Sequence, residues 1–233
     1  MKRPTIFAAL PTYDGRRRNA EAMCQLVGIK DAEVRYLESQ SSLLAFGFNL
    51  LWVRALNERP DYFLMLHDDI APLDHDWAVT LFREFQTTRA SVLSAVVPIK
   101  TPEGLTSTAL ETEDPWHPKR LTMTEVFERP ETWTEPGLLL NSGLMLVDFR
   151  QAWVEQVCFT IEDQIRRDDS GKWTAEVKSE DWNFSRQARA LGASLYATRK
   201  IRAQHVGPAG YRNDRVWGTV ATDPQFAQAE ALR

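Results

Sequence analysis

The stretch Tyr62-Phe63-Leu64-Met65-Leu66-His67-Asp68-Asp69 decides how the rest of this sequence is interpreted. Its first five residues predict a buried strand, and a histidine and two aspartates follow that strand directly. Ligands of parallel α/β sheets bind just past the carboxyl ends of strands. Carboxylates in such a place are expensive to desolvate unless they face a cation or another partner. The stretch therefore predicts a metal site at the mouth of a sheet. The alternative is a solvated strand end with a capping aspartate.

The composition is that of a globular protein with a hydrophobic core. The chain has 233 residues, of which 43% are hydrophobic and 26% are charged, enough for one large domain or two small ones. No membrane span and no signal peptide are expected, because the apolar stretches are too short for either. The net charge of −4 argues against a general nucleic-acid coat protein. Cys24 and Cys158 fall in helix-like patterns, and we expect buried free thiols in a reducing compartment.

Strand-like and helix-like segments alternate along most of the chain. The patterns predict strands at residues 5–10, 33–37, 62–66, 91–97 and 194–198. They predict helices at residues 17–28, 43–56, 74–88, 151–166 and 180–191. Asp74 or Asp76 is expected to cap the third of these helices. The alternation indicates an α/β domain with a mostly parallel sheet and helices on both faces.

Residues 101–137 differ from this pattern. They are rich in proline, threonine and glutamate, and they show little periodicity. Loops of this length inside a compact domain are usually functional or disordered. We therefore expect a long irregular insertion here, and we expect the tail from residue 207 onward to be irregular as well.

Two further groups of residues have the chemistry of a reactive site. His205 follows the last predicted strand and could be the second protein ligand of a metal, although a lone histidine is more often structural. The glycine at position 207 would allow a close approach. Glu180 and Asp181 begin a helix, where the helix dipole favours acids. The same place suits a general base that takes a proton from an attacking hydroxyl, and spacing alone does not choose between these interpretations.

Polar residues at two other places are candidates for ligand contacts. Arg16, Arg17 and Arg18 open a helix, where positive charge opposes the helix dipole. They would be explained by an anion such as a diphosphate, or they splay into solvent. Asn49 is the polar exception inside an apolar helix. It would either satisfy a buried backbone group or point into the pocket to contact a base or a sugar.

These motifs, in this order, resemble those of glycosyltransferases with the GT-A fold, in particular the inverting, family 2-like enzymes that use nucleotide-diphosphate sugars. The resemblance implies a Rossmann-like GT-A domain at residues 1–207 with an acceptor-side insertion at 101–137, and a tail at 208–233 that closes over the donor site. The turn Pro11-Thr12-Tyr13-Asp14-Gly15 is similar to the turn that holds the nucleotide in this family. His67-Asp68-Asp69 corresponds to the family's Asp-x-Asp motif, with histidine in the first place.

The resemblance also implies a role for each matched residue. Asp69 and His205 would hold Mn²⁺ or Mg²⁺, and Asp181, beside Glu180, would be the catalytic base. The implied donor-binding residues are Pro11, Thr12, Tyr13, Asp14, Arg16, Asn49, Asp68, Asn141, Ser142 and Gly143. The implied reaction moves a sugar from a nucleotide-diphosphate donor, expected to be a UDP-sugar, to a hydroxyl acceptor in a single inverting displacement. The sequence does not show which carboxylate faces the anomeric carbon, so a retaining outcome stays open.

The resemblance indicates only the broad class of the acceptor. Relatives of this kind glycosylate glycans or proteins, and some phage relatives modify bases of DNA, so a glycan or a hydroxymethylated DNA base is the expected acceptor. The arginines at 16–18, Lys119-Arg120 and Arg212 with Arg215 are candidate phosphate contacts in the second case. The expected location is the cytoplasm of a bacterium or of a phage-infected host. The sequence does not predict an oligomeric state.

Two other functions compete with this one. A nucleotidyltransferase acting on sugar phosphates shares a related fold, but it normally carries a glycine-rich loop after the first strand, which residues 11–18 lack. A non-catalytic sugar-binding domain of the same fold is the other alternative.

Overall fold

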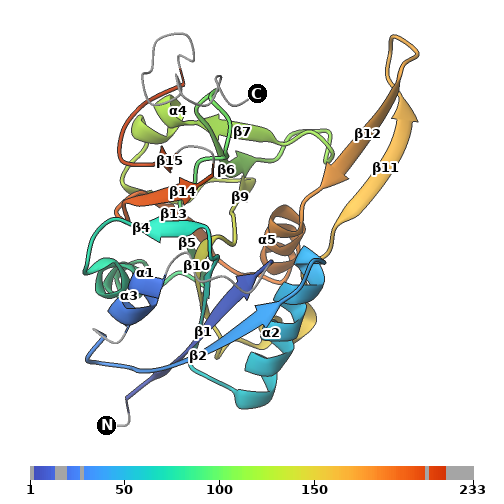
Figure 1. Ribbon diagram of the computed structural model, residues 1–233. Coiled ribbons are helices and arrows are strands. Elements are labelled where there is room, and N and C mark those ends of the chain that lie inside the picture. Colours follow the sequence, from blue (N-terminus) through green and yellow to red (C-terminus); the bar gives the residue numbers. More distant parts are fainter. Residues whose placement is uncertain (1–2, 14–19, 27–28, 208–209, 219–233) are drawn as a thin grey trace.

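The fold is built around one large sheet. The structure, a computed structural model, describes residues 3–13, 20–26, 29–207 and 210–218. Within these residues seven strands form a sheet, as Figure 1 shows. Their order is β2 (Glu33–Gln40), β1 (Thr5–Thr12), β3 (Tyr62–Leu66), β10 (Leu144–Asp148), β5 (Val92–Ala95), β13 (Leu195–Thr198) and β8 (Thr132–Trp133). All are parallel except β10 and β8, which run antiparallel to their neighbours.

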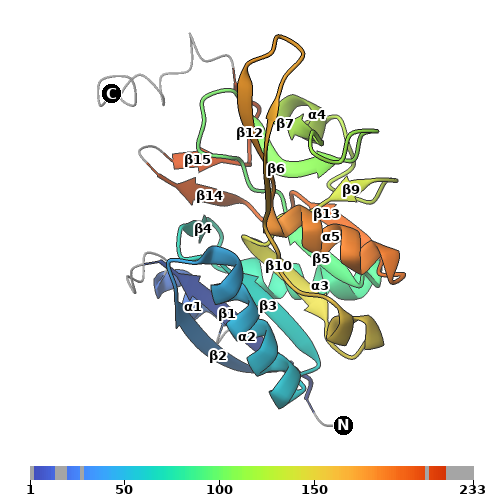
Figure 2. The same cartoon turned by 90° about the vertical axis from the view of Figure 1, so that its right-hand side faces the viewer.

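Helices cover both faces of this sheet, and each face has its own hydrophobic core. Helices α1 (Ala20–Leu26) and α3 (Trp77–Thr88) lie on one face, and α2 (Leu44–Glu58) and α5 (Glu180–Ala190) lie on the other (Figures 1 and 2). In the second core, the Trp52 ring centroid lies 4.8 Å from that of Phe63 and 5.4 Å from that of Phe184. Strand β3 is buried along its whole length, which explains why residues 62–66 are continuously apolar.

The predicted α/β fold with a mostly parallel sheet is confirmed. Each of the five predicted strands forms, and α-helices form within four of the five predicted helical segments. Of the two aspartates, either of which the sequence predicts as the cap of α3, Asp76 holds the N-cap position, but its side chain makes no capping hydrogen bond. Asp74 instead accepts hydrogen bonds from Nε of Arg202 at 3.1 and 2.9 Å, so its charge is used to bind the segment before β14 (Ala203–Val206).

Residues 151–166 do not form the helix that the sequence predicts. They begin with the short 3₁₀ helix η1 (Ala152–Gln156) and continue as an extended segment into β11 (Glu162–Arg167). Burial alternates along the extended segment, with Val157 and Phe159 in the core and Cys158 exposed between them. This period of two is a strand pattern, which overrides the helical propensity of the flanking residues. Cys158 and Cys24 are free, as expected, but both are exposed rather than buried.

Strand β11 continues into a hairpin that the sequence did not predict. It pairs in antiparallel register with β12 (Trp173–Lys178), and Figure 1 shows the hairpin projecting beyond the rest of the fold. The chain then enters α5 directly. The hairpin therefore stands beside the start of that helix.

Residues 101–137 are less irregular than the sequence predicts, because they contain strands and a helix between their loops. A three-stranded sheet consists of β7 (Lys119–Thr122), β6 (Leu105–Leu110) and β9 (Leu138–Leu139). Helix α4 (Met123–Phe127) begins with a capping box in which Thr122 and Glu125 exchange hydrogen bonds. Some threonine hydroxyls of this segment bond inside the fold, as Thr106 Oγ1 does to the Leu121 carbonyl at 2.9 Å.

A third small sheet brings the end of the described chain next to β3. Strand β4 (Ile70–Pro72) pairs with β14, which pairs with β15 (Gly210–Arg212). In this register His205 lies opposite Ile70, the residue that follows Asp69. Within the tail, residues 210–212 are therefore a strand rather than irregular chain. Its predicted closure over the donor site concerns residues 208–233, most of which lie outside the described residues.

Candidate active site

The ends of β1, β2 and β3 and the start of α2 enclose a pocket of about 150 Å³. It is lined by Pro11, Thr12, Tyr13, Ser39, Ser41, Ser42, Leu44, Gly47, Phe48, His67, Asp68 and Asp69. The turn after β1 and the acidic motif after β3 therefore meet at one cavity, which is where the sequence predicts a donor site. Thr12 Oγ1 lies 3.3 Å from Asp68 Oδ2 and joins the two walls.

Asp69 is the centre of a charged cluster at the end of β3. Lys100 Nζ lies 2.5 Å from Asp69 Oδ2, and His205 Nε2 lies 3.2 Å from the same oxygen. The Asp69 carbonyl accepts a hydrogen bond from Val206 N at 2.7 Å, which fixes β14 against this turn. Asp69 and His205, predicted to bind one cation, therefore converge.

The groups around Asp69 keep it ionised. Burial alone would raise the pKa of this carboxyl, but the hydrogen bonds and charges of His205 and Lys100 outweigh burial and lower the pKa far below its usual range. Burial also lowers the pKa of His67 to about 4, because a buried imidazolium is poorly solvated. His67 is therefore neutral at physiological pH and adds no charge to the cluster.

The cluster fits a divalent cation with two protein ligands. His205 Nδ1 lies 2.7 Å from the carbonyl oxygen of Pro98, which can only accept, so Nδ1 carries a hydrogen and Nε2 faces Asp69. Metal-ligating histidines commonly donate their second N–H in this way. Over the described ranges, no group of three or more His, Cys, Asp or Glu side chains is arranged to hold a metal. Substrate phosphates and water would therefore complete the shell, as is usual for Mg²⁺.

A second polar group lies at the start of α5. Asp181 Oδ1 accepts two hydrogen bonds from Ser142, one from Oγ at 2.5 Å and one from the backbone N at 3.2 Å. Ser142 Oγ also lies 3.3 Å from His67 Nε2. Because β10 is antiparallel to β3, its beginning adjoins the end of that strand. The contacts from Asp181 through Ser142 to His67 therefore connect the start of α5 with the wall of the pocket.

Burial gives both acids of this helix start a raised pKa. Burial raises the pKa of Asp181, although the hydrogen bonds from Ser142 and the charge of Arg120 act in the opposite direction. Burial raises the pKa of Glu180 as well, and the charge of Asp181 adds to that effect. A buried carboxylate whose pKa approaches neutrality is suited to accept a proton from a substrate. Both bonds from Ser142 end on Oδ1, so Oδ2 is the oxygen that can receive the proton.

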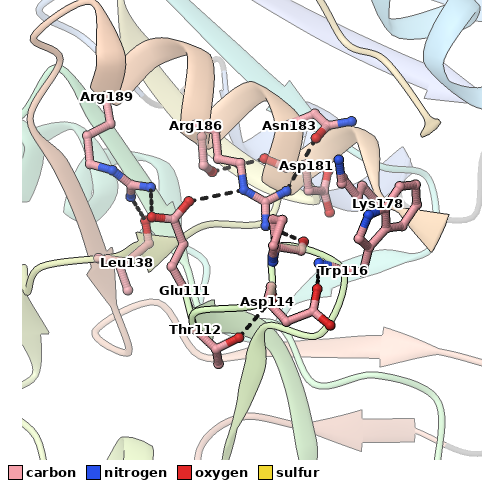
Figure 3. Close-up of polar contacts among 12 residues, drawn as sticks. Glu111, Thr112, Asp114, Trp116, Leu138, Lys178, Asp181, Asn183, Arg186 and Arg189 are labelled. Carbon is pink, nitrogen blue, oxygen red and sulfur yellow. Dashed lines mark hydrogen bonds and ion pairs between the residues drawn. The ribbon is translucent and has the colours of Figure 1, made fainter. Parts of the chain in front are cut away.

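The insertion is docked on α5 close to Asp181, as Figure 3 shows. Arg186 Nε donates to Glu111 Oε1 at 3.0 Å, and an Arg189 nitrogen lies 2.7 Å from Glu111 Oε2. Arg186 also donates to the Pro115 carbonyl at 2.8 Å. These contacts hold segment 111–115 against the second half of α5.

Two residues predicted for the donor site, Asn49 and Asn141, are held by backbone groups in the structure. Asn49 Nδ2 donates to the Phe159 carbonyl and Asn49 Oδ1 accepts from the Phe159 N–H, each at 2.8 Å. Asn49 therefore satisfies buried backbone groups, which is the first of the two roles that its sequence position suggested. Asn141 Nδ2 donates to the Ala95 carbonyl at 3.0 Å, and Asn141 Oδ1 accepts from the Gly143 N–H at 2.8 Å. Backbone groups hold both ends of each amide, so neither amide is presented to the pocket.

Of the other predicted donor residues, some line the pocket and some do not. Those that line it are Pro11, Thr12, Tyr13 and Asp68. Gly143 shapes the turn before β10, because its carbonyl accepts from His67 N at 2.9 Å, and its hydrogen-bonded turn packs against Ile70. Ser142 contacts Asp181 rather than the pocket. Asp14 and Arg16 lie outside the described residues.

The structural role of Asn49 leads to a stability prediction. Asn49→Ala is expected to lower the free energy of unfolding by about 1–3 kcal/mol, because two backbone groups of Phe159 lose their partners. Asn57→Ala, at an exposed place on the same helix, is the control and is expected to change it by less than about 0.5 kcal/mol. Urea denaturation measures both values. Unchanged stability with weakened nucleotide binding would return Asn49 to the donor site.

Lys100 is a site residue that the sequence did not reveal. It lies just past β5, and our interpretation of that strand ended at Pro98. The available signal was its place beyond a strand end, where the sequence analysis searched for acids and histidines only.

The fold has counterparts among solved structures. No protein-family model matches the sequence, and no curated protein is significantly similar to it. The crystal structure of A197 from STIV matches with a TM-score of 0.53 and 17% identity, covering 91% of each chain. The mannosyltransferase PcManGT from Pyrobaculum calidifontis, in complex with GDP-Man and Mn²⁺, matches with a TM-score of 0.48 and 11% identity, covering 90% of this chain and 59% of that one. A glycosyltransferase involved in the glycosylation of the major capsid of PBCV-1 has a TM-score of 0.36 and 15% identity, covering 66% and 64%.

The predicted α/β fold with a mostly parallel sheet has a counterpart in A197 from STIV, and at 17% identity the likeness concerns the fold alone. Among the helices of the described residues, none is long and apolar enough to cross a membrane.

Proposed function

We propose that this protein is a glycosyltransferase that moves a sugar from a nucleotide-diphosphate donor to a hydroxyl group. One observation carries the proposal. Asp69 and His205 converge at the rim of a pocket whose wall connects through His67 and Ser142 to the carboxylate of Asp181. A cation site for the leaving diphosphate and a base for the incoming hydroxyl are the two requirements of a single displacement at a sugar carbon.

The pocket supplies the donor half of the site. Asp69 and His205 are the proposed ligands of Mn²⁺ or Mg²⁺, which would neutralise negative charge on the leaving diphosphate. Tyr13 is 72% exposed at the pocket and offers a ring face to the nucleotide base. Thr12 holds the Asp68 carboxylate in the pocket wall, where it can accept hydrogen bonds from hydroxyls of the ribose or the sugar. A UDP-sugar is the proposed donor.

Asp181 is the proposed base. Its Oδ2 takes the proton of the acceptor hydroxyl while the hydroxyl oxygen forms a bond to the anomeric carbon. The bond from that carbon to the diphosphate breaks in the same step, and the proton remains on Asp181. Attack opposite the leaving group inverts the anomeric configuration. Ser142 fixes the carboxylate through Oδ1 and so keeps Oδ2 turned toward the acceptor.

The acceptor is proposed to approach between α5 and the insertion. Arg120, on β7, lies with Cζ 4.5 Å from the centre of the Trp182 ring, and its charge acts on Asp181. An arginine beside the base can bind a phosphate or a carboxylate of the acceptor. This favours a charged glycan or a hydroxymethylated base within DNA.

A donor screen tests the proposal. The thermal midpoint of the chain is measured with Mn²⁺ and, in turn, UDP-, GDP- and TDP-sugars, and one nucleotide class is expected to raise it. The donor found in this way is then incubated with candidate acceptors, and release of the nucleoside diphosphate is expected. Release of pyrophosphate from a nucleoside triphosphate and a sugar phosphate would indicate a nucleotidyltransferase instead. A chain that binds no sugar nucleotide would contradict the proposal.

The raised pKa of Asp181 predicts a pH dependence. The base acts only when ionised, and burial raises the pKa of Asp181 to about 6. Turnover at saturating donor is therefore expected to fall about tenfold per pH unit below this value and to level off above it. Donor affinity, measured over the same pH range, is the control. A turnover that stays constant from pH 5 to pH 8 would remove Asp181 from the proton transfer.

A further inference from the structure

We propose that Lys100 is a built-in, exchangeable counter-ion of Asp69, which a divalent cation and the donor diphosphate together must displace. This inference rests on the proposed metal site at Asp69 and His205, and it concerns a residue for which the sequence predicted no role. Lys100 would hold the carboxylate in place before the metal binds. Once released, its ammonium would be a second positive charge for the diphosphate.

Two side-chain nitrogens approach the same carboxylate oxygen of Asp69. Lys100 Nζ at 2.5 Å and His205 Nε2 at 3.2 Å both approach Oδ2 of Asp69. The side chains of Lys100, Asp69 and His205 are 32%, 24% and 18% exposed, so water screens their interactions only partly. A divalent cation bound to Asp69 and His205 would sit against the ammonium group. Two cations at this separation repel strongly, so Lys100 has to leave when the metal enters.

The fold provides a dedicated place for the lysine side chain. A Cβ built on Gly207 would lie 2.9 Å from Lys100 Cδ, so the lysine stem would have to shift from its present position. The absence of a side chain at this position therefore leaves the groove that the lysine stem occupies. The glycine after His205 does permit a close approach, but the group that approaches is Lys100 rather than the metal.

The segment at residues 98–100, which carries Lys100, also orients His205. The Pro98 carbonyl holds His205 Nδ1 at 2.7 Å, and Lys100 follows two residues later. The connection after β5 therefore positions one metal ligand and supplies the group that competes with the metal. A shift of this short segment would act on both.

This arrangement predicts that the metal and the nucleotide bind together. Without nucleotide, Mn²⁺ must displace the ammonium with nothing to receive it, so it binds weakly. With a nucleoside diphosphate present, the phosphates attract the released ammonium, and Mn²⁺ binds more tightly. Removing the positive charge of Lys100 should strengthen the binding of Mn²⁺ alone and reduce its dependence on nucleotide.

The test measures Mn²⁺ binding directly, by the electron paramagnetic resonance signal of free Mn²⁺, without and with UDP or GDP. For the intact chain without nucleotide, Lys100→Met is expected to lower the dissociation constant of Mn²⁺ about tenfold or more. Lys100→Arg keeps the charge and should behave as the unmodified protein. The matched control is Lys200→Met, which removes a lysine whose Nζ is paired with Glu84 at 2.7 Å outside the site.

A second variant keeps the test valid if Lys100→Met folds poorly. Gly207→Ala fills the groove of the lysine stem while leaving every charge in place, and it should shift Mn²⁺ affinity in the same direction. An unchanged or weakened affinity in both variants, or no Mn²⁺ binding by any form, would overturn the proposal. The proposed glycosyl transfer is tested separately by the donor screen, so a shifted Mn²⁺ affinity without any transfer would reject the function and retain the role of Lys100.

Discussion

Asp181→Asn is expected to reduce turnover about 10²- to 10⁴-fold while leaving donor affinity unchanged. The variant keeps the shape of the side chain and an oxygen that can accept both hydrogen bonds from Ser142. It lacks a group that can take the acceptor's proton. Initial rates of nucleoside diphosphate release and the dissociation constant of the donor measure the two quantities. Asp163→Asn, at an exposed place on β11, is the control and should change neither.

The same substitution is expected to leave the fold as stable as before or more stable. The pKa of Asp181 is raised in the folded protein, so the folded chain binds this proton more tightly than the unfolded chain does. Stability from this group is therefore present at low pH and is lost as the pH rises through the folded pKa. Asparagine removes the buried charge, and the thermal midpoint at pH 8 should not fall. A large fall in the midpoint would mean that the lost turnover reflects damage to the structure.

Asp69→Asn is expected to abolish Mn²⁺-dependent donor binding and to lower turnover by about a thousandfold or more. The carboxylate is the only charged oxygen ligand proposed for the cation, and an amide is a far weaker ligand for it. The variant also leaves Lys100 and His205 beside a neutral group, which weakens their attachment to β3. Titration with the donor, with and without Mn²⁺, measures the effect.

A matched variant separates loss of the site from loss of the fold. Asp76→Asn removes a carboxylate from the next connection along the chain, and that residue is exposed at the start of α3. It should bind donor and metal normally. Full transfer activity in Asp69→Asn would show that the cation, if needed, is held elsewhere.

The central strand was predictable because its signal is local. Residues 62–66 are apolar without interruption and are followed by charged residues, and a run of this short length, set between Pro60 and the acidic motif, is typical of a strand buried on both faces. The place of Asp69 follows from the same rule, since ligands gather past strand ends. The convergence of Asp69 with His205 was predictable only in part, because both residues follow strands that the sequence predicts, but His205 itself lies within β14, where it pairs opposite Ile70.

The residues that escaped prediction depend on contacts between distant parts of the chain. Asn49 is bound by the backbone of Phe159, which is 110 positions away, and nothing within α2 indicates that partner. Lys100 reaches Asp69 only because Gly207 leaves space for it. Val157 and Phe159 were read as part of a helix because short apolar runs fit either period, and the core beneath α2 decided between them.

The antiparallel direction of β10 has a consequence for how such a protein can change. The chain leaves the sheet at the end of β5, builds the whole of residues 101–137, and re-enters through β10 at the same edge. Apart from β8, which lies within this excursion and pairs with β13 at the edge of the sheet, the excursion can therefore be lengthened, shortened or exchanged without altering the pairing of the other six strands. A lineage with this architecture can change the surface beside α5 by replacing parts of one stretch of its gene, while the proposed donor pocket, which that stretch does not line, is inherited intact.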